Sequence, residues 1–149
     1  MEVKFYEQAP DHQLKFAVII AKAHGKWVFC RHRQRDTYEL PGGHREAEES
    51  ILDAATRELQ EETGALDFSL VPVCAYSVVG KNQVNPSGEE AFGMLYASEA
   101  GLGGAEIIKF AREIEQVLFL DELPRDLKPW TYPMIQPKLV EEAKRRNLV

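Results

Sequence analysis

The chain has 149 residues, of which 44% are hydrophobic and 28% are charged, and its formal net charge is −6. This length and composition suit one globular domain with its own hydrophobic core, and we expect residues 1–149 to form it. The negative charge argues against a nucleic-acid polymer as partner, because such binding depends on neutralising phosphates with Lys and Arg. The charge does not exclude a small phosphorylated ligand that is held through a divalent cation.

The sequence contains no candidate membrane segment, because no apolar run approaches the ~20 residues needed to cross a bilayer. Residues 1–7 carry neither the basic region nor the apolar region of a signal peptide. We therefore expect a cytoplasmic protein without a membrane partner.

In chain order, the first predicted elements form a β-hairpin. Lys15 to Ala21 is typical of a strand, His24-Gly25 of a turn, and Lys26 to His32 of the returning strand. Three later segments are β-rich, and two have the composition of loops. The β-rich segments are residues 68–79, 91–98 and 115–120, and the loops are residues 80–88 and 101–104.

The first predicted helix runs from Ser50 to Thr63. Ser50 is a suitable N-cap, and Gly64 stands where a helix end favours a residue with positive φ. At about 100° per residue, the apolar side chains form one stripe that can pack on a sheet. This stripe consists of Ile51, Leu52, Ala55 and Leu59.

The second predicted helix spans Tyr132 to Asn147. Its first turn tolerates Pro133, although Pro137 blurs the boundary. Together these elements predict a mixed α and β domain in which two helices cover the faces of a curved sheet.

The cysteines and histidines show no pattern typical of metal ligands. Cys30 and Cys74 each lie inside an apolar segment, and we expect both to be buried, reduced and inert. The four histidines lack ligand spacing, and we interpret them as structural or exposed. They are His12, His24, His32 and His44.

Glu58, Glu61 and Glu62 stand at positions i, i+3 and i+4 of the first helix and should share a face. Each like-charged pair costs about 0.2–0.5 kcal/mol, and the helix dipole adds about 0.3–1 kcal/mol for each anion near the C-terminus. A hard divalent cation such as Mg²⁺ would offset this repulsion. The alternative is a solvated acidic face. Context favours the cation, because Gly42-Gly43 permits close backbone approach to a ligand and Arg57 can orient a carboxylate.

These residues also form a recognisable motif. It reads Gly43, five residues, Glu49, seven residues, Arg57-Glu58-Leu59, one residue, Glu61-Glu62, one residue, Gly64. The motif resembles the Nudix box at every fixed position, although Ala65 stands where the family usually has Ile, Leu or Val. The preceding segment from Tyr38 to Gly43 is similar to the family's aromatic-x-Leu-Pro-Gly-Gly lead-in, with Tyr38 in place of the commoner Trp.

The resemblance implies an α+β Nudix fold, in which a mixed curved β-sheet is sandwiched between helices (α/β/α sandwich). It implies Mg²⁺ as cofactor, with Mn²⁺ as the other candidate, held by the Gly43 carbonyl, Glu58, Glu61 and Glu62. Arg57 and Glu49 would support these carboxylates. The general base would be Glu58 or a glutamate on a later loop. For that second option Glu113 is the first candidate, followed by Glu115, Glu89 and Glu90. The candidate catalytic set is thus Glu58, Arg57, Glu61 and Glu113.

The substrate expected from the resemblance is a nucleotide. Residues 78–83 lack the proline and tyrosine that mark the ADP-ribose and diadenosine polyphosphate subfamilies, and the coenzyme A and NADH signatures are missing. We therefore expect a nucleoside triphosphate pyrophosphohydrolase, such as an 8-oxo-dGTP diphosphatase, that yields the monophosphate and pyrophosphate. The alternatives are a hydrolase of ADP-ribose or a nucleotide sugar, and a non-catalytic nucleotide sensor. Relatives often dimerise, so the resemblance is also compatible with a homodimer.

Candidate substrate-binding residues flank the expected cleft. Tyr38 and Trp130 could stack on a base, although aromatic residues at the start of an element also serve as core packing. Arg31 and Arg45 could hold phosphates by bidentate hydrogen bonds, or could be merely solvated.

Overall fold

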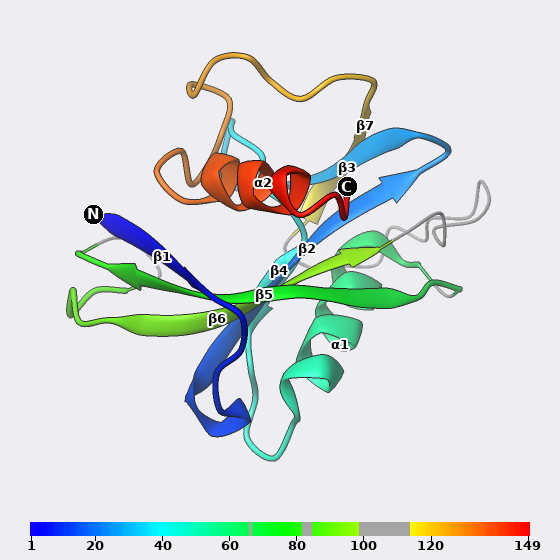
Figure 1. The fold of residues 1–149 in the computed structure, drawn as a ribbon. Helices are drawn as coiled ribbons and strands as arrows, with labels where there is room; N and C mark the ends of the chain where they lie inside the picture. The colour runs from blue at the N-terminus through cyan, green and yellow to red at the C-terminus, as the bar shows by residue number, and fades with distance from the viewer. Residues whose placement is uncertain (66, 82–84, 99–113) are drawn as a thin grey trace.

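A mixed β-sheet forms the centre of the molecule, with a helix on each face (Figure 1). The structure is a computed structural model that describes residues 1–65, 67–81, 85–98 and 114–149, without the side chains of residues 114 and 115. The elements in chain order are β1 (Glu2–Tyr6), the 3-10 helix η1 (Asp11–Gln13), β2 (Leu14–Ala23), β3 (Lys26–His32), β4 (Gly42–His44), α1 (Ile51–Thr63), β5 (Leu70–Val79), β6 (Ala91–Ser98), β7 (Ile114–Leu120) and α2 (Gln136–Arg145).

The strand order is β1-β5-β6-β2-β3-β7, and the short strand β4 pairs with β2. Among the strand pairs of the described residues, β2 and β6 run parallel and the others are antiparallel. Strands β2 and β3 pair only next to their turn, at Lys22↔Trp27 and Ala23↔Lys26. Further along, residues 39–44 lie between them, because Glu39 pairs with Cys30 of β3 while β4 pairs with β2. The sheet thus holds the segment before α1 in a fixed place.

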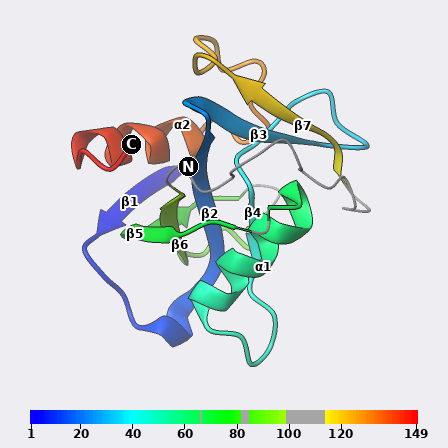
Figure 2. The same cartoon turned by 90° about the vertical axis from the view of Figure 1, so that its right-hand side faces the viewer.

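Alternate side chains of β2 face opposite helices. Phe16 and Ile20 belong to the core that packs on α2, whereas Ala17 and Ile19 belong to the core beneath α1. A view from the side shows the two helices on opposite faces of the sheet (Figure 2). Small side chains on the α1 side, including the fully buried Ala17, let this helix approach the sheet closely. The expected sandwich of a mixed sheet between helices is confirmed.

Helix α1 confirms the expected boundaries. The Ser50 side chain accepts a hydrogen bond from the Asp53 amide, and Gly64 adopts the left-handed conformation at φ +74°. One member of the predicted apolar stripe is wrong: Leu52 is 49% exposed, and Ala54 is buried instead. Leu52 is rotated by about 100° from Ile51, which places it at the edge of the buried stripe.

Helix α2 starts at Gln136, four residues later than the sequence predicts from Tyr132. The reason is Pro137, which lies in the first turn of the helix. A proline has no amide hydrogen to donate, so it fits the first turn and would break a helix that began at Tyr132. The strands β1 and β4 were not foreseen from the sequence. Among the described residues, no helix is long and apolar enough to cross a membrane.

Candidate active site

Gly43 lies directly against the Glu58 carboxylate. Strand β4 runs beside α1, and a Cβ atom placed on Gly43 would lie 2.6 Å from both Cδ and Oε1 of Glu58. At Gly42 a Cβ would instead collide with the backbone oxygen of Ala17. A side chain is therefore excluded at the two positions for different reasons. Gly42 allows β4 to pair with β2, and Gly43 leaves room for the Glu58 carboxylate.

The three glutamates of α1 occupy different environments, although their spacing predicts one shared face. The Glu61 side chain is 57% exposed, whereas those of Glu58 and Glu62 are 14% and 8% exposed. Glu62 points towards the sheet, where its Oε1 accepts a hydrogen bond of 2.7 Å from the Gly42 amide. Burial raises the pKa of the Glu58 carboxyl and also that of the Glu62 carboxyl.

Arg57 connects the acidic residues to one another. Its Nε and Nη2 donate to the two carboxylate oxygens of Glu49, at 2.7 and 3.0 Å. Its Nη1 donates to Glu58 at 2.7 Å and to Glu61 at 3.2 Å, and Nη2 also donates to the backbone oxygen of His44. One guanidinium thus holds three carboxylates and the end of β4, and its hydrogen bonds lower the pKa of the Glu49 carboxyl.

The repulsion among the glutamates is therefore offset in part within the chain. The sequence suggests a bound cation as the source of that compensation, and the structure shows the Arg57 guanidinium in this place. The repulsion among the glutamates is therefore not by itself evidence for a bound metal. The interpretation as a metal site depends on the oxygen donors that lie around Gly43.

A second charged cluster lies beneath the site and was not foreseen from the sequence. His32, at the end of β3, has its Nε2 3.3 Å from Glu62 Oε2 and 3.4 Å from Glu39 Oε1. Glu39 is 7% exposed and accepts a 2.9 Å hydrogen bond from Arg35. The hydrogen bond with Glu62 raises the pKa of the His32 imidazole, and burial raises that of the Glu39 carboxyl. The charged Glu39 between Tyr38 and Leu40 is the sequence feature that points to this cluster, but only the tertiary structure identifies its partners.

The two predicted aromatic contacts lie in the core region. Trp130 is 4% exposed, and its ring meets Phe29 edge-on at a centroid distance of 5.1 Å. Tyr38 is half-buried and also packs on Phe29, while its backbone bonds to Pro129 and Thr131. In this position Trp130 fills the core and offers no open face for a base.

The candidate phosphate-binding and late catalytic residues are placed as follows. Arg31 donates to the backbone oxygen of Arg35 at 3.3 Å. Glu90 accepts hydrogen bonds from Tyr6 and Ser77, and Glu89 is exposed. Glu113 lies outside the described residues, as does the side chain of Glu115.

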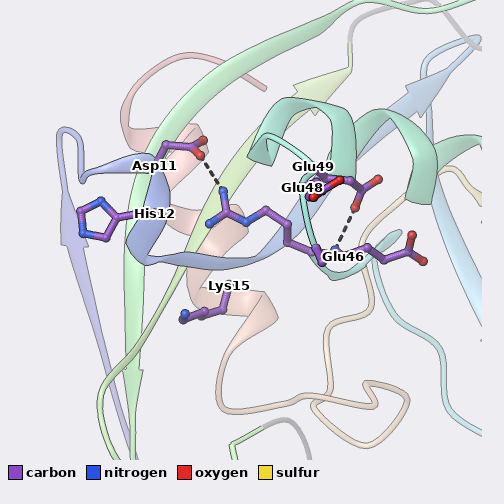
Figure 3. Close-up of a pocket in the computed structure, with 8 residues that line it drawn as sticks. Asp11, His12, Lys15, Glu46, Glu48 and Glu49 are labelled. Atoms are coloured by element: carbon purple, nitrogen blue, oxygen red, sulfur yellow. Dashed lines mark hydrogen bonds and ion pairs between the residues drawn. The ribbon is translucent and has the colours of Figure 1, made fainter.

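Arg45 lies beside the beginning of α1. It forms a 2.6 Å ion pair with Asp11, whose other oxygen accepts from the Ile51 amide, so the pair secures the first turn of the helix. A hollow of about 340 Å³ lies here, lined by Asp11, His12, Lys15, Arg45 and residues 46–49 (Figure 3). Glu49 belongs to this hollow and to the Arg57 network, whereas the glutamates of α1 do not line it.

Comparison with known families decides the classification. A model of the NUDIX domain family matches residues 11–137. The chain belongs to the NUDIX family.

Two curated relatives align with parts of this Nudix chain. YtkD of Bacillus subtilis, named for a proposed 8-oxo-dGTP diphosphatase activity, is 38% identical over 84 residues, covering 56% of the chain and 52% of YtkD. A Lactococcus lactis protein, named for a proposed DHNTP pyrophosphohydrolase activity, is 44% identical over 55 residues, covering 37% of the chain and 32% of that protein. The chain thus spans about half and about a third of the lengths of these relatives.

Solved structures share the Nudix fold over nearly the whole chain. The Bacillus subtilis pyrophosphohydrolase BsRppH, solved as a point mutant, has a TM-score of 0.71 at 26% identity, covering 97% of this chain and 90% of that one. A NUDIX hydrolase from Nitrosomonas europaea has a TM-score of 0.70 at 18% identity, covering 89% and 90%. The second likeness shows a common fold alone.

The Nudix fold implies a divalent metal, and the donor set here fits one. Among the described residues, no three His, Cys, Asp or Glu side chains converge into a complete metal site. The available donors are nevertheless carboxylate and backbone oxygens, the ligands that Mg²⁺ and Mn²⁺ prefer. The absence of a side chain on Gly43 leaves its backbone open to the Glu58 carboxylate, and the exposed Glu61 has room to turn.

Proposed function

We propose that this chain is a metal-dependent Nudix pyrophosphohydrolase that cleaves a diphosphate linkage in a nucleotide-like substrate. One observation carries the proposal. The sheet and α1 place the Glu58 carboxylate against the Gly43 backbone and the Glu62 carboxylate at the Gly42 amide, and Arg57 donates a hydrogen bond to Glu58. Two largely buried carboxylates beside a glycine backbone, one of them held by an arginine, suit phosphate chemistry.

The metal would be held by the Gly43 carbonyl, Glu58, Glu61 and Glu62. When bound, a divalent cation neutralises phosphate oxygens and lowers the pKa of water. The protein's own contribution is positional: Arg57 fixes Glu58 and Glu49, and the Gly42 amide fixes Glu62. Either Glu58 or a glutamate of the later loop, with Glu113 as the first candidate, would accept the proton of the attacking water.

The substrate that we favour is a nucleoside triphosphate of the 8-oxo-dGTP type, converted to the monophosphate and pyrophosphate. The support is the alignment with YtkD and the lack of subfamily markers for other substrates. Dihydroneopterin triphosphate is a second candidate, supported by the Lactococcus lactis relative. Both molecules present a 2-amino-4-oxopyrimidine ring and a triphosphate, so one site could recognise features common to both.

A substrate panel tests this proposal. The full chain would be incubated with 8-oxo-dGTP, dGTP, dihydroneopterin triphosphate, ADP-ribose and nucleotide sugars, with Mg²⁺, with Mn²⁺ and with EDTA. We expect metal-dependent release of pyrophosphate from one of the triphosphates and no release in EDTA. Turnover of ADP-ribose or a nucleotide sugar alone would replace the substrate class. Nucleotide binding without any turnover would instead support a sensor and contradict the enzymatic function.

A further inference from the structure

One imidazole separates two buried carboxylates beneath the candidate metal site. The His32 Nε2 atom lies 3.3 Å from Glu62 Oε2 and 3.4 Å from Glu39 Oε1, and the two carboxylate side chains are 8% and 9% exposed. Buried carboxylates this close to one donor need it as a partner, because an unpaired buried charge is strongly unfavourable.

Glu39 is itself fixed, so it can hold the imidazole in place. Its backbone exchanges two hydrogen bonds with Cys30, of 2.7 and 2.9 Å. Its carboxylate accepts a 2.9 Å hydrogen bond from Arg35, which also lies 3.4 Å from the Tyr132 hydroxyl. This chain of contacts runs from the segment before α2 to the imidazole and ends at Glu62.

The contacts of Glu62 differ at its two oxygens. Oε1 accepts from the Gly42 amide at 2.7 Å, whereas Oε2 faces His32. With both oxygens engaged, rotation of the carboxylate is restricted. Each carboxylate oxygen has two acceptor sites, so one lone pair on each oxygen stays available for a cation.

We propose that His32 is a positioning residue, which together with Glu39 orients the Glu62 carboxylate for metal binding. The proposal rests on the metal-dependent function proposed above. Groups that hydrogen-bond to a metal-binding side chain commonly set its orientation, and their loss costs about 10–100-fold in metal affinity or activity. A merely structural His32 would affect folding stability and leave metal affinity unchanged.

The test compares two replacements of His32 in the full-length protein. His32→Leu removes the hydrogen-bond donor and substitutes an apolar side chain of similar bulk. His32→Gln retains a hydrogen-bond donor of similar reach. Mn²⁺ affinity is measured without substrate, by electron paramagnetic resonance titration of the metal-free protein. The kinetic constants kcat and KM, at saturating Mn²⁺, and the free energy of unfolding are measured in parallel. His12→Leu, at an exposed histidine of η1, is the matched control.

We expect His32→Leu to weaken Mn²⁺ binding and lower kcat by about 10–100-fold each, with KM changed by less than about threefold. His32→Gln should recover most of the Mn²⁺ affinity, and His12→Leu should match the wild type. A folded His32→Leu variant with unchanged Mn²⁺ affinity would overturn the proposal.

Two further outcomes are also decisive. If His32→Leu does not fold, His32→Asn replaces it, because this shorter amide cannot reach Oε2 of Glu62; equal Mn²⁺ affinities of the Asn and Gln variants would then refute the positioning role. If the wild type binds no Mn²⁺, the proposed metal-dependent function fails and this inference fails with it. If the wild type and His32→Leu bind Mn²⁺ equally well, only the proposed role of His32 is refuted.

Discussion

The Glu58 carboxylate rests against the Cα atom of Gly43, with no room for a Cβ between them. Gly43 belongs to β4 and Glu58 to α1, so this contact connects the strand that inserts beside β2 with the helix that covers the sheet. The absence of a side chain at residue 43 therefore determines where a carboxylate of the candidate site lies.

Gly43→Ala should reduce turnover more than stability. The new Cβ would meet the end of a flexible side chain, so Glu58 can move away at little cost to folding, but its carboxylate leaves its place. We expect kcat to fall by about 10–100-fold, as for other changes that displace a metal-binding group. Gly25→Ala is the control, since nothing lies within 4 Å of its Cβ position. Full activity of Gly43→Ala would show that the position of Glu58 is unimportant.

Arg57→Lys should lower kcat even though the charge is kept. Lysine cannot reproduce the paired hydrogen bonds to Glu49 together with the bond to Glu58. We expect a loss of about 10–100-fold in steady-state assays. Arg125→Lys, in an ion pair whose side chains are 89% and 77% exposed, should change nothing. A fully active Arg57→Lys enzyme would mean that a point charge suffices at this position.

Glu61→Gln and Glu62→Gln should both reduce turnover by orders of magnitude. Glu61 is mostly exposed and its ion pair with Arg57 contributes at most about 1 kcal/mol, so Glu61→Gln should leave the free energy of unfolding nearly unchanged. Glu62→Gln keeps a carbonyl oxygen that can accept from the Gly42 amide and removes a charge that burial disfavours, so we expect only a small loss of folding stability. Denaturant unfolding and pyrophosphate release would be compared with Glu122→Gln, which replaces another exposed glutamate. Normal turnover in both variants would refute the metal assignment.

Trp130→Ala should destabilise the fold without a specific effect on substrate affinity. Removing a buried Trp side chain costs about 3–5 kcal/mol, because it leaves a cavity against Phe29. Urea unfolding measures this loss, and Phe119→Ala, at a 42% exposed position, should cost much less. A raised KM with unchanged stability would instead return Trp130 to the substrate site.

Glu142 should make α2 sensitive to acid. Hydrogen bonds from Arg145 and Arg146 lower the pKa of its carboxyl from 4.5 to about 2. Because the folded-state pKa is below the unfolded one, the stabilisation is present above about pH 4.5 and is lost as the pH falls towards 2. Glu142→Gln should therefore be less stable than the wild type at neutral pH and equal to it near pH 2 in urea titrations. The exposed Glu141→Gln is the control, and a stability difference independent of pH would contradict the ion-pair explanation.

Much of the local structure followed from the sequence, because it depends on neighbouring residues. The N-cap at Ser50 and the left-handed Gly64 define both ends of α1 through short-range hydrogen bonds and backbone sterics. The turn at His24-Gly25 is defined in the same way, but the predicted hairpin is correct only next to this turn, since β2 and β3 pair at two positions there. The sequence pattern from Tyr132 onwards is compatible with a helix, but Pro137 must lie in the first turn, so α2 begins at Gln136.

The sequence by itself also indicated the family, since the spacing of Gly43, Glu49 and the residues of α1 can be recognised without a structure. Only the tertiary structure decided how these residues interact. It buried Glu62 against the sheet, left Glu61 exposed, and placed His32 between Glu39 and Glu62. The physical reason is that residues 39–44 insert between β2 and β3, which are separate from them in sequence. The spacing of residues along a helix does not reveal which residues of other elements they contact.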